Sequence, residues 1–368
     1  MPQIRFFERG PAVFAAALIC LASLGLARPA LAEQLVVVAG PATGRHSALL
    51  RTLADAAPRA AAAASPTLKI IEEDDGCDPA RAKGTAALIV DKKPSLVIGH
   101  PCPAAAIAAA PLYAAAGIPF IALGVRHPAL TSPRAGPAVF RLAGRDDRQG
   151  DAAAEALLRA APEKRIAIIQ DRTAYARSIL AETTGALTRA AAPPALVLPI
   201  VAGRRDYEPE IAKLAAAKPE AILFAGYPSE AAVILRGLRK AGLTATLIAS
   251  DANATPEFAE AANLSNSPAD AVQVLTPAEA HSGADAIPPQ SRGLSILAAA
   301  AIESWTAAAS AAGSNDPAKI AAALSAAPVA TQSMGEISFD ANGDARLPSF
   351  TAARLVAGQW SHEMKLAR

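Results

Sequence analysis

The chain has 368 residues, which is too long for one compact hydrophobic core and suits two domains. Its hydrophobic content of 52 %, much of it alanine, excludes an intrinsically disordered chain. The formal net charge is only +2 and the charges are scattered, so the chain has no strong field that would attract nucleic acid or an anionic membrane surface.

Residues 1–32 have the three regions of a secretory signal. Arg5 and Arg9 give a positively charged start, and the apolar stretch Ala12–Leu26 follows. Ala30-Leu31-Ala32 then offers a small-x-small cleavage site. We therefore expect cleavage before Glu33, which removes three arginines and one glutamate and leaves a net charge of about zero.

Two other interpretations of the leader are less favoured. The apolar stretch is short for a membrane span, which argues against a retained N-terminal anchor. Lipid attachment at Cys20 is weaker still, because the bulky Ile19 stands where lipoprotein processing needs a small residue. We expect a soluble mature chain with no stable membrane insertion.

From Gln34 onward, apolar strands alternate with helices. The run Leu35–Ala39, ended by Gly40, has the continuous apolar character of a strand buried on both faces. The same alternation predicts helices at 45–64, 79–92 and 103–116, and strands at 67–72, 95–99 and 118–123. This order predicts a doubly wound parallel sheet.

The alternation is interrupted near Arg141 and then restarts. Residues 140–150 are polar and marked by glycines, so we expect them to cross from one lobe to another. A second α/β series follows, with helices at 151–160, 174–190, 207–217 and 229–241 and strands at 165–170, 195–200, 221–225 and 246–250. Helices at 292–312 and 317–327 then return, and residues 335–344 are predicted to form a hairpin with an Asn342-Gly343 turn.

Cys77 and Cys102 are the only cysteines outside the leader, and each follows a predicted strand. An even pair in an exported chain indicates a disulfide, and the alternative is two unpaired buried thiols. No histidines stand at metal-ligand spacing, and neither a Cys-x-x-Cys nor a Gly-x-Ser-x-Gly motif occurs. The sequence therefore predicts no metal site, no cofactor and no catalytic residues.

The segment Gly40–Arg45 follows a strand and opens a helix, but it lacks the lysine and the glycine spacing of a nucleotide-binding loop. We interpret it as a tight turn at the carboxyl end of a strand. Ligands of open α/β sheets bind at such ends, so Thr43 and Ser47 could contact one.

Two segments carry a family resemblance. Asp74-Asp75-Gly76-Cys77-Asp78-Pro79 and Val97-Ile98-Gly99-His100-Pro101-Cys102 resemble motifs of the periplasmic leucine/isoleucine/valine-binding proteins of ABC importers. Further matching pieces follow in the family's order, among them Gly117-Ile118-Pro119, His127-Pro128-Ala129-Leu130-Thr131, Gln149-Gly150, Asp206-Tyr207, Gly226-Tyr227 and Ala241-Gly242-Leu243. The resemblance covers nearly the whole mature chain.

The resemblance implies a type I periplasmic binding protein, an α/β fold of two doubly wound lobes joined by three crossovers. Lobe one would comprise 33–142 plus 276–330, and lobe two 143–275 plus 331–368. It also implies a Cys77–Cys102 disulfide bond. The expected protein is a monomeric periplasmic receptor that binds a small molecule between its lobes and delivers it to ABC transporter membrane subunits, with no enzymatic activity.

In lobe one, the family binds the ligand carboxylate with a serine and with the first amides of a helix. Here that serine is replaced by Pro103, which has neither a hydroxyl nor an N–H, so only the amides of Ala104 and Ala105 remain. Gly124 and Arg126 follow the next strand. An arginine there could hold a carboxylate, or it could form a surface or inter-lobe salt bridge.

In lobe two, the resemblance implies that Tyr175 and Tyr227 pack on the ligand and that Asp251 replaces a glutamate that pairs with an α-ammonium. The alternatives are ordinary packing for the tyrosines and a helix cap for the aspartate. An amino acid or related small carboxylate is the expected ligand. An aromatic acid, an amide or a dicarboxylate, or a sensing role without transport, are the alternatives.

Overall fold

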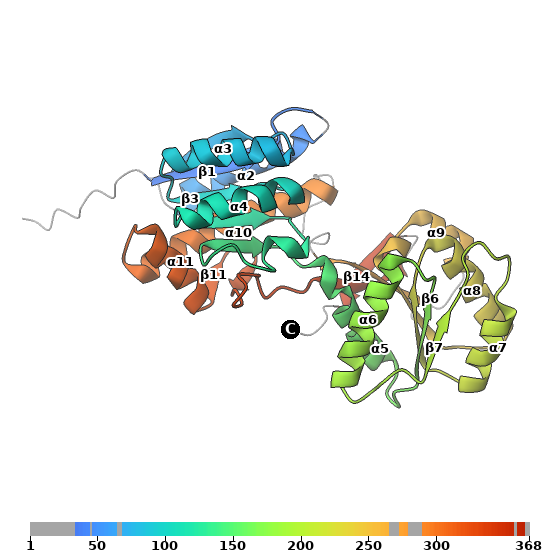
Figure 1. The fold of residues 1–368 in the computed structure, drawn as a ribbon. Coiled ribbons are helices and arrows are strands. Elements are labelled where there is room, and N and C mark those ends of the chain that lie inside the picture. Colours follow the sequence, from blue (N-terminus) through green and yellow to red (C-terminus); the bar gives the residue numbers. More distant parts are fainter. Residues whose placement is uncertain are drawn as a thin grey trace, which may run out of the picture.

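The computed structural model describes residues 34–44, 46–64, 68–264, 272–278, 289–356 and 359–364. The predicted signal peptide 1–32 lies outside these residues. Two α/β lobes lie side by side, and the chain passes between them after β5, after β10 and before β13 (Figure 1).

The first lobe is built on a five-stranded sheet whose neighbours all pair in parallel. Its interior strands are buried on both faces, which explains their continuous apolar sequences. The strand order is β2 (Leu68–Asp74), β1 (Gln34–Gly40), β3 (Leu96–Gly99), β4 (Phe120–Leu123) and β5 (Val139–Leu142).

Helices cover both faces of this sheet. One face packs against α2 (Ser47–Ala64), α10 (Pro289–Ala312) and α11 (Pro317–Ala326). The other packs against α3 (Pro79–Asp91) and α4 (Pro103–Ala115). The expected alternation of helices and strands in this region is therefore present, with ends that differ by at most three residues.

Helix α10 contains Gly293–Ala312, the only stretch among the described residues that is long and apolar enough to span a membrane. Half of this stretch is buried within the lobe. Ile302 and Trp305 belong to the core of the first lobe, and the Trp305 indole donates a hydrogen bond to the carbonyl of Ser95 at 3.1 Å. The apolar character of the stretch Gly293–Ala312 is explained by its packing in the core of the first lobe.

The second lobe contains a mixed seven-stranded sheet. Strands β6 to β10 pair in parallel; of the two C-terminal strands, β13 pairs antiparallel with β10, and β14 pairs antiparallel with β13. The order is β14 (Gln359–Met364), β13 (Phe350–Val356), β10 (Val272–Pro277), β9 (Thr246–Ala249), β8 (Ala221–Ala225), β6 (Ile166–Gln170) and β7 (Leu196–Pro199). The alternation of strands and helices in the sequence does not predict β10, β13 or β14.

Helices flank both faces of this second sheet. Helices α5 (Gln149–Ala160) and α6 (Ala174–Arg189) contribute to the core on one face. Helices α7 (Glu208–Ala217), α8 (Pro228–Lys240) and α9 (Pro256–Ala261) contribute to the core on the other.

The boundary expected at residue 331 differs from the structure. Strands β11 (Val329–Thr331) and β12 (Gly335–Ile337) form a hairpin, and Ile337, Phe339 and Ala345 pack in the core of the first lobe. The chain therefore stays in the first lobe well past residue 331 and enters the second sheet only with β13. The predicted Asn342-Gly343 turn is present, with Gly343 at φ 79° and a bridge between Phe339 and Ala345.

The crossing expected at 140–150 also begins later than the sequence indicated, because Val139–Leu142 forms a buried strand. The arginine in this strand makes the sequence look polar. Arg141 is fully buried, and its charge is compensated by Asp344 at 2.7 Å and by the carbonyls of Val125 and His127 at 2.8 Å. A buried charge is tolerated when it is paired and hydrogen-bonded.

The predicted pairing of Cys77 and Cys102 is present, with Cα atoms 5.4 Å apart. The bond joins the loop after β2 to the N-cap residue of α4. It closes a loop across 25 residues, for which the chain-entropy model gives about 3 kcal/mol of stabilisation.

Candidate functional site

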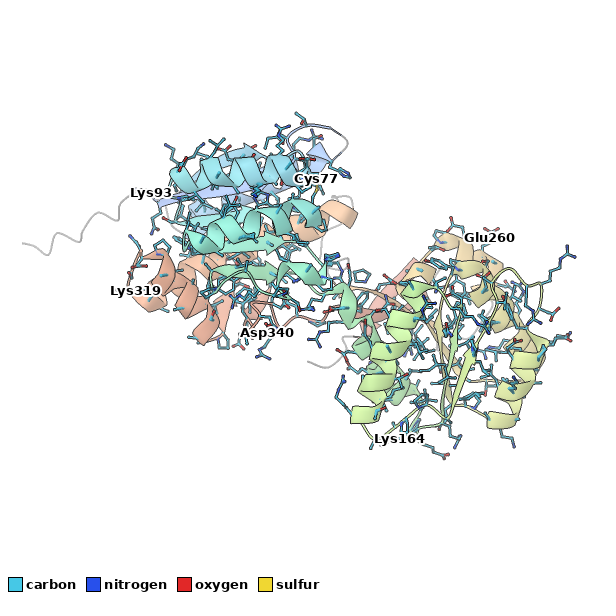
Figure 2. All side chains as sticks on the ribbon, in the orientation of Figure 1. Cys77, Lys93, Lys164, Glu260, Lys319 and Asp340 are labelled. Carbon is cyan, nitrogen blue, oxygen red and sulfur yellow. A yellow bond between two sulfur atoms is a disulfide. The ribbon has the colours of Figure 1, made fainter. Side chains whose placement is uncertain are left out.

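In each lobe the parallel strands end at one edge of the sheet, so the turns that follow them lie together. Lys93, before β3, and Cys77, after β2, lie at opposite ends of the first lobe, with Cys77 on the side of the second lobe (Figure 2). In the second lobe, Lys164 precedes β6 at the far end, and Glu260 lies in α9 beyond the end of β9 (Figure 2). Ligands of open α/β sheets bind at such ends, so these turns are the candidate site.

Three predicted site residues of the second lobe meet there. Tyr175 lies in the first turn of α6, Tyr227 is the N-cap residue of α8, and Asp251 follows β9. The Tyr175 hydroxyl donates a hydrogen bond to Oδ1 of Asp251. The two tyrosine rings have centroids 5.7 Å apart, tilted by 34°. Tyr227 is 45 % exposed, which leaves an aromatic face open to a ligand.

The direction of the Tyr175 hydrogen bond follows from its protonation. Burial, and then the charge of Asp251, raises the pKa of Tyr175 well above its usual value. The phenol therefore stays protonated at neutral pH and donates to the carboxylate. Oδ2 of Asp251 has no hydrogen-bond partner among the described residues, so Asp251 retains an acceptor that a ligand can use.

Two residues that were not predicted from the sequence support this cluster. Ser250 Oγ donates to the Gly226 carbonyl at 3.0 Å, and Asn253 Nδ2 donates to the same carbonyl at 3.0 Å. Both side chains are fully buried. They fix the turn that carries Asp251 against the turn that carries Tyr227. Their polar character between an apolar strand and a helix was a signal that could have been used.

Gln149 is a further missed residue. It begins α5 just after the crossover from the first lobe and is 2 % exposed. Its Oε1 lies 3.4 Å from the Tyr175 hydroxyl. The cluster is thereby connected to the segment between the lobes.

In the first lobe, Pro103 and Ala104 are exposed at the start of α4. Cys102 is the N-cap residue but makes no side-chain hydrogen bond to the helix. Amides of a first helical turn have no acceptor within their own helix, so those of Ala104 and Ala105 form a potential anion site. Gly124 follows β4 at φ 72°, and a Cβ there would lie 3.0 Å from Leu294 of α10.

Arg126 is placed differently from the carboxylate-binding role suggested by the sequence. Its Nε donates to Asp146 Oδ1 at 2.7 Å, and its Nη2 donates to the Ser349 carbonyl at 2.9 Å. The guanidinium also lies over the Phe350 ring, 4.7 Å from its centroid. Arg126 thus joins the crossover segments, in the manner of an inter-lobe salt bridge.

The turn after β1 is held by the side chain of Asp74. Asp74 accepts hydrogen bonds from the amides of Ala42 at 2.8 Å and Gly76 at 2.9 Å, and Thr43 Oγ1 lies 3.5 Å from its second oxygen. Burial acts to raise the pKa of Asp74, but these amide bonds and the charge of Arg81 outweigh it and lower the pKa. Asp74 is therefore a carboxylate that shapes the turn, with Thr43 directed to it.

The part of the chain that the structure describes contains no candidate metal site. No three histidine, cysteine, aspartate or glutamate side chains gather there in an arrangement that could hold an ion. The chemistry that the candidate site offers is hydrogen bonding, charge and an aromatic surface.

The chain is similar to known proteins of one family. A family model described as periplasmic binding protein matches residues 35–359. An amino acid binding protein of Pseudomonas aeruginosa is 30 % identical over 365 residues, covering 93 % of this chain and 94 % of the relative. A Leu/Ile/Val-binding protein homolog of Brucella abortus is 29 % identical over 297 residues, covering 77 % of this chain and 78 % of the relative.

Solved structures share the fold at lower identity. A putative branched-chain amino acid ABC transporter protein from Rhodospirillum rubrum superposes with a TM-score of 0.70 at 20 % identity, covering 90 % of this chain and 99 % of that one. A solute-binding protein from R. palustris, in complex with benzoate, gives 0.52 at 17 % identity and covers 90 % of this chain and 95 % of that one. The expected architecture of two α/β lobes joined by three crossovers is thereby confirmed.

Proposed function

Because the chain belongs to the periplasmic binding protein family and has its type I fold, we propose that it is the periplasmic receptor of an ABC importer and binds an amino acid or related small carboxylate between its lobes. The observation that carries this proposal is the cluster of Tyr175, Tyr227 and Asp251 at the carboxyl ends of the strands of the second lobe. The family is a class of solute-binding proteins, and the proposed function requires no covalent chemistry.

The second lobe supplies recognition of an amine. The Tyr175 hydroxyl occupies Oδ1 of Asp251 and holds the carboxylate in place, while Oδ2 remains available to a ligand N–H. A charge-assisted hydrogen bond of this kind is roughly twice as strong as a neutral one. The aspartate is one methylene shorter than the glutamate of the family, so the amine must approach closely or through a water molecule.

The first lobe supplies recognition of a carboxylate. The start of α4 presents the amides of Ala104 and Ala105 and the positive end of the helix dipole. Pro103 removes the hydroxyl that the family pattern has here, so this subsite is weaker than its family counterpart. An amino acid bridging the lobes would place its ammonium at Asp251 and its carboxylate at α4.

Capture would follow from closure of the lobes around the ligand. A ligand that contacts both lobes binds the closed form better than the open one and therefore shifts the population toward closure. The closed form would then dock on the membrane subunits of the importer. A monomer exported to the periplasm, with the leader removed and the disulfide formed, is the form expected to act.

An aromatic acid is the second candidate ligand. The exposed ring of Tyr227 beside Tyr175, and the loss of the serine hydroxyl at Pro103, suit a flat aromatic body better than a small aliphatic one. A structural neighbour was solved with benzoate, which makes this class worth testing. Amides and dicarboxylates are further candidate ligands, and ligand sensing without transport is a further candidate role.

A thermal-shift panel on mature Glu33–Arg368 tests these ligand classes directly, with amino acids, amides, aromatic acids and dicarboxylates as the probes. A ligand at 100 times its Kd adds about 2.7 kcal/mol to the free energy of unfolding, which is easily detected. A rise in Tm with an amino acid supports the main proposal, and a rise only with benzoate-like acids supports the second. No shift with any small carboxylate contradicts both.

Asp251→Asn then tests the amine subsite. Replacing the carboxylate removes one partner of a charge pair, so amino acid affinity should fall by about thirtyfold or more, while a plain carboxylic acid should bind unchanged. Calorimetric titration measures both affinities. Asp206→Asn, at an exposed carboxylate elsewhere in the same lobe, is the control. Equal loss for both ligand types would show that Asp251 does not bind the amine.

A further inference from the structure

Three buried polar side chains form a continuous hydrogen-bonded chain in the first lobe. Asp75 follows β2, His100 follows β3 and Tyr113 lies in α4, and all three residues are 0 % exposed. His100 Nδ1 lies 2.8 Å from Asp75 Oδ2, and His100 Nε2 lies 2.9 Å from the Tyr113 hydroxyl. The ring of Phe120 contacts both rings, with centroids 5.6 and 5.1 Å away.

The protons of this chain can be assigned from the groups themselves. Burial, and then the charge of Asp75, raises the pKa of Tyr113 far above its usual value, so the phenol is protonated. A neutral imidazole that donates from Nδ1 to Asp75 and accepts at Nε2 from Tyr113 satisfies every polar atom of the chain. The other oxygen of Asp75 accepts the amide of Cys77 at 2.8 Å.

This chain restrains a turn whose backbone is unfavourable. Gly99 has φ 117° and His100 has φ 45°, so two successive residues are in the left-handed half of conformational space. The His100 amide bonds the Ala39 carbonyl at 2.6 Å, which brings the turn directly against the end of β1. A non-glycine residue keeps such a conformation only where its surroundings determine it, and here the two bonds of the imidazole do so.

The start of α4 is fixed from outside the helix. Its N-cap residue, Cys102, makes no side-chain hydrogen bond to the first turn, and Pro103 contributes no N–H. The His100 chain on one side and the disulfide to Cys77 on the other tie this turn to the loop after β2. The two ties join the same pair of loops.

We infer that Asp75, His100 and Tyr113 are positioning residues for the ligand: they hold the turn between β3 and α4 so that the first amides of α4 meet the ligand carboxylate, with or without the disulfide. The inference rests on the proposed function, which assigns those amides to the carboxylate. These three residues would then affect ligand affinity although they are fully buried and do not contact the ligand.

Tyr113→Phe is the direct test, because it removes only the hydroxyl and leaves Nε2 of His100 unpaired. Its matched control is Tyr207→Phe, which removes a hydroxyl bound to the Val201 carbonyl at 3.0 Å in a buried tyrosine of the other lobe. The probes are L-leucine paired with L-leucinamide and benzoate paired with benzamide. Calorimetry should show Tyr113→Phe weakening each acid about tenfold while the amides are unaffected, and Tyr207→Phe changing neither.

The disulfide enters as a second perturbation. Because it stabilises chiefly by restricting the unfolded chain, Cys77→Ser with Cys102→Ser should leave acid affinity within about threefold of wild type. Adding Tyr113→Phe to this pair removes the disulfide and also one of the two hydrogen bonds that hold His100, and it should cost more than the product of the separate losses. A strictly multiplicative loss, or an acid loss matched by the amide, overturns the inference.

Hydrogen exchange gives a readout that needs no ligand. In the unliganded protein, Tyr113→Phe should accelerate exchange at residues 102–106 and leave the second lobe unchanged, whereas Tyr207→Phe should not affect this turn. Equal exchange at this turn in both variants overturns the inference. If wild type binds none of the four probes, the proposed function fails, and the exchange comparison still decides whether the turn is held by this chain.

Discussion

In the described part of the protein, charged side chains are buried near the crossovers between the lobes. Arg141 and Asp344 are examples, and each is paired with a group of opposite charge. Arg141 is 0 % and Asp344 6 % exposed. Asp344 accepts from Arg141 and from Thr131 at 2.7 Å through one oxygen, and from Arg145 at 2.8 Å through the other. Removing one member would leave the others uncompensated in a low-dielectric environment, which is why such networks are sensitive to substitution.

Asp344→Asn should therefore be strongly destabilising. The amide keeps the size of the side chain but removes the charge that neutralises Arg141, at an expected cost of about 3–5 kcal/mol in the free energy of unfolding. Urea unfolding followed by circular dichroism measures it. Asp206→Asn, at a carboxylate whose side chain is 64 % exposed, should leave the urea midpoint unchanged. Similar midpoints for the two variants would contradict this account of the network.

The same network predicts a loss of stability in acid. Burial acts to raise the pKa of Asp344, but its hydrogen bonds from Arg145 and Thr131 and the charge of Arg141 outweigh burial and lower the pKa. The Arg145 hydrogen bond, in spite of burial, lowers the pKa of Asp147 as well. Carboxyls whose pKa is lower when folded stabilise fully above the unfolded value of about 3.9 and lose that contribution as pH falls through the folded value.

Urea midpoints should thus stay level from neutral pH to about 5 and fall progressively below about 4. Asp344→Asn, already lacking one such carboxylate, should show a shallower acid decline than wild type. Parallel declines for the two proteins would mean that Asp344 does not contribute to the acid transition.

The family resemblance, together with the rule that ligands bind beyond strand ends, gave the candidate site residues. Tyr175, Tyr227 and Asp251 follow β6, β8 and β9, and the fold brings their side chains together. Arg126 followed the same rule and lies among the crossovers instead, because its contacts at Asp146 and Ser349 come from segments far along the chain. A rule about local position cannot anticipate such partners.

At the scale of elements, continuous apolar runs and glycine-marked ends predicted most strands and helices of the two sheets. Strand β5 was missed because the buried charge of Arg141 makes a strand look polar unless its distant partner Asp344 is known. Strands β13 and β14 were missed because they join the second sheet antiparallel, outside the alternation of strand and helix on which the prediction was based.

Two glycines allow a matched test of element geometry. A Cβ on Gly99, at φ 117°, would lie 2.1 Å from the Ala39 carbonyl oxygen, so Gly99→Ala must displace the turn between β3 and α4. Gly84 lies within α3, and a Cβ there meets nothing within 4 Å. We expect Gly99→Ala to lose more than about 4 kcal/mol or fail to fold, and Gly84→Ala to gain about 0.5–1 kcal/mol through helix propensity.

Thermal unfolding of the two variants measures the expected loss of stability for Gly99→Ala and the expected gain for Gly84→Ala. A folded Gly99→Ala protein with a wild-type Tm would show that the turn can relax away from β1. A destabilised Gly84→Ala protein would show that α3 has less room at this position than its surroundings indicate.

In the whole molecule, the chain crosses three times between lobes that each have their own core, so movement of one lobe against the other must be absorbed by the crossovers. Figure 1 shows the lobes side by side, joined by these few segments. The contacts made there, and not the packing inside either lobe, determine how readily the carboxyl ends of the two sheets approach one another.

Arg126 is the residue through which this can be tested, because the two interpretations of it predict opposite results. In this arrangement it holds Asp146, the Ser349 carbonyl and the Phe350 ring. If those contacts stabilise the unliganded arrangement, Arg126→Ala lowers the free energy that a ligand must supply for closure, and ligand affinity rises, by about tenfold for each 1.4 kcal/mol removed. If Arg126 instead grips the ligand carboxylate, affinity falls.

Calorimetric titration of the probe that gives the largest thermal shift decides between them, and small-angle scattering of the unliganded proteins provides an independent measure. We expect Arg126→Ala to bind more tightly and to have a smaller radius of gyration than wild type, because the closed population grows. Arg236→Ala, which removes a guanidinium bound to the Ala261 carbonyl within the second lobe, should change neither quantity. Weaker binding with an unchanged radius of gyration would show that Arg126 binds the ligand and does not control closure.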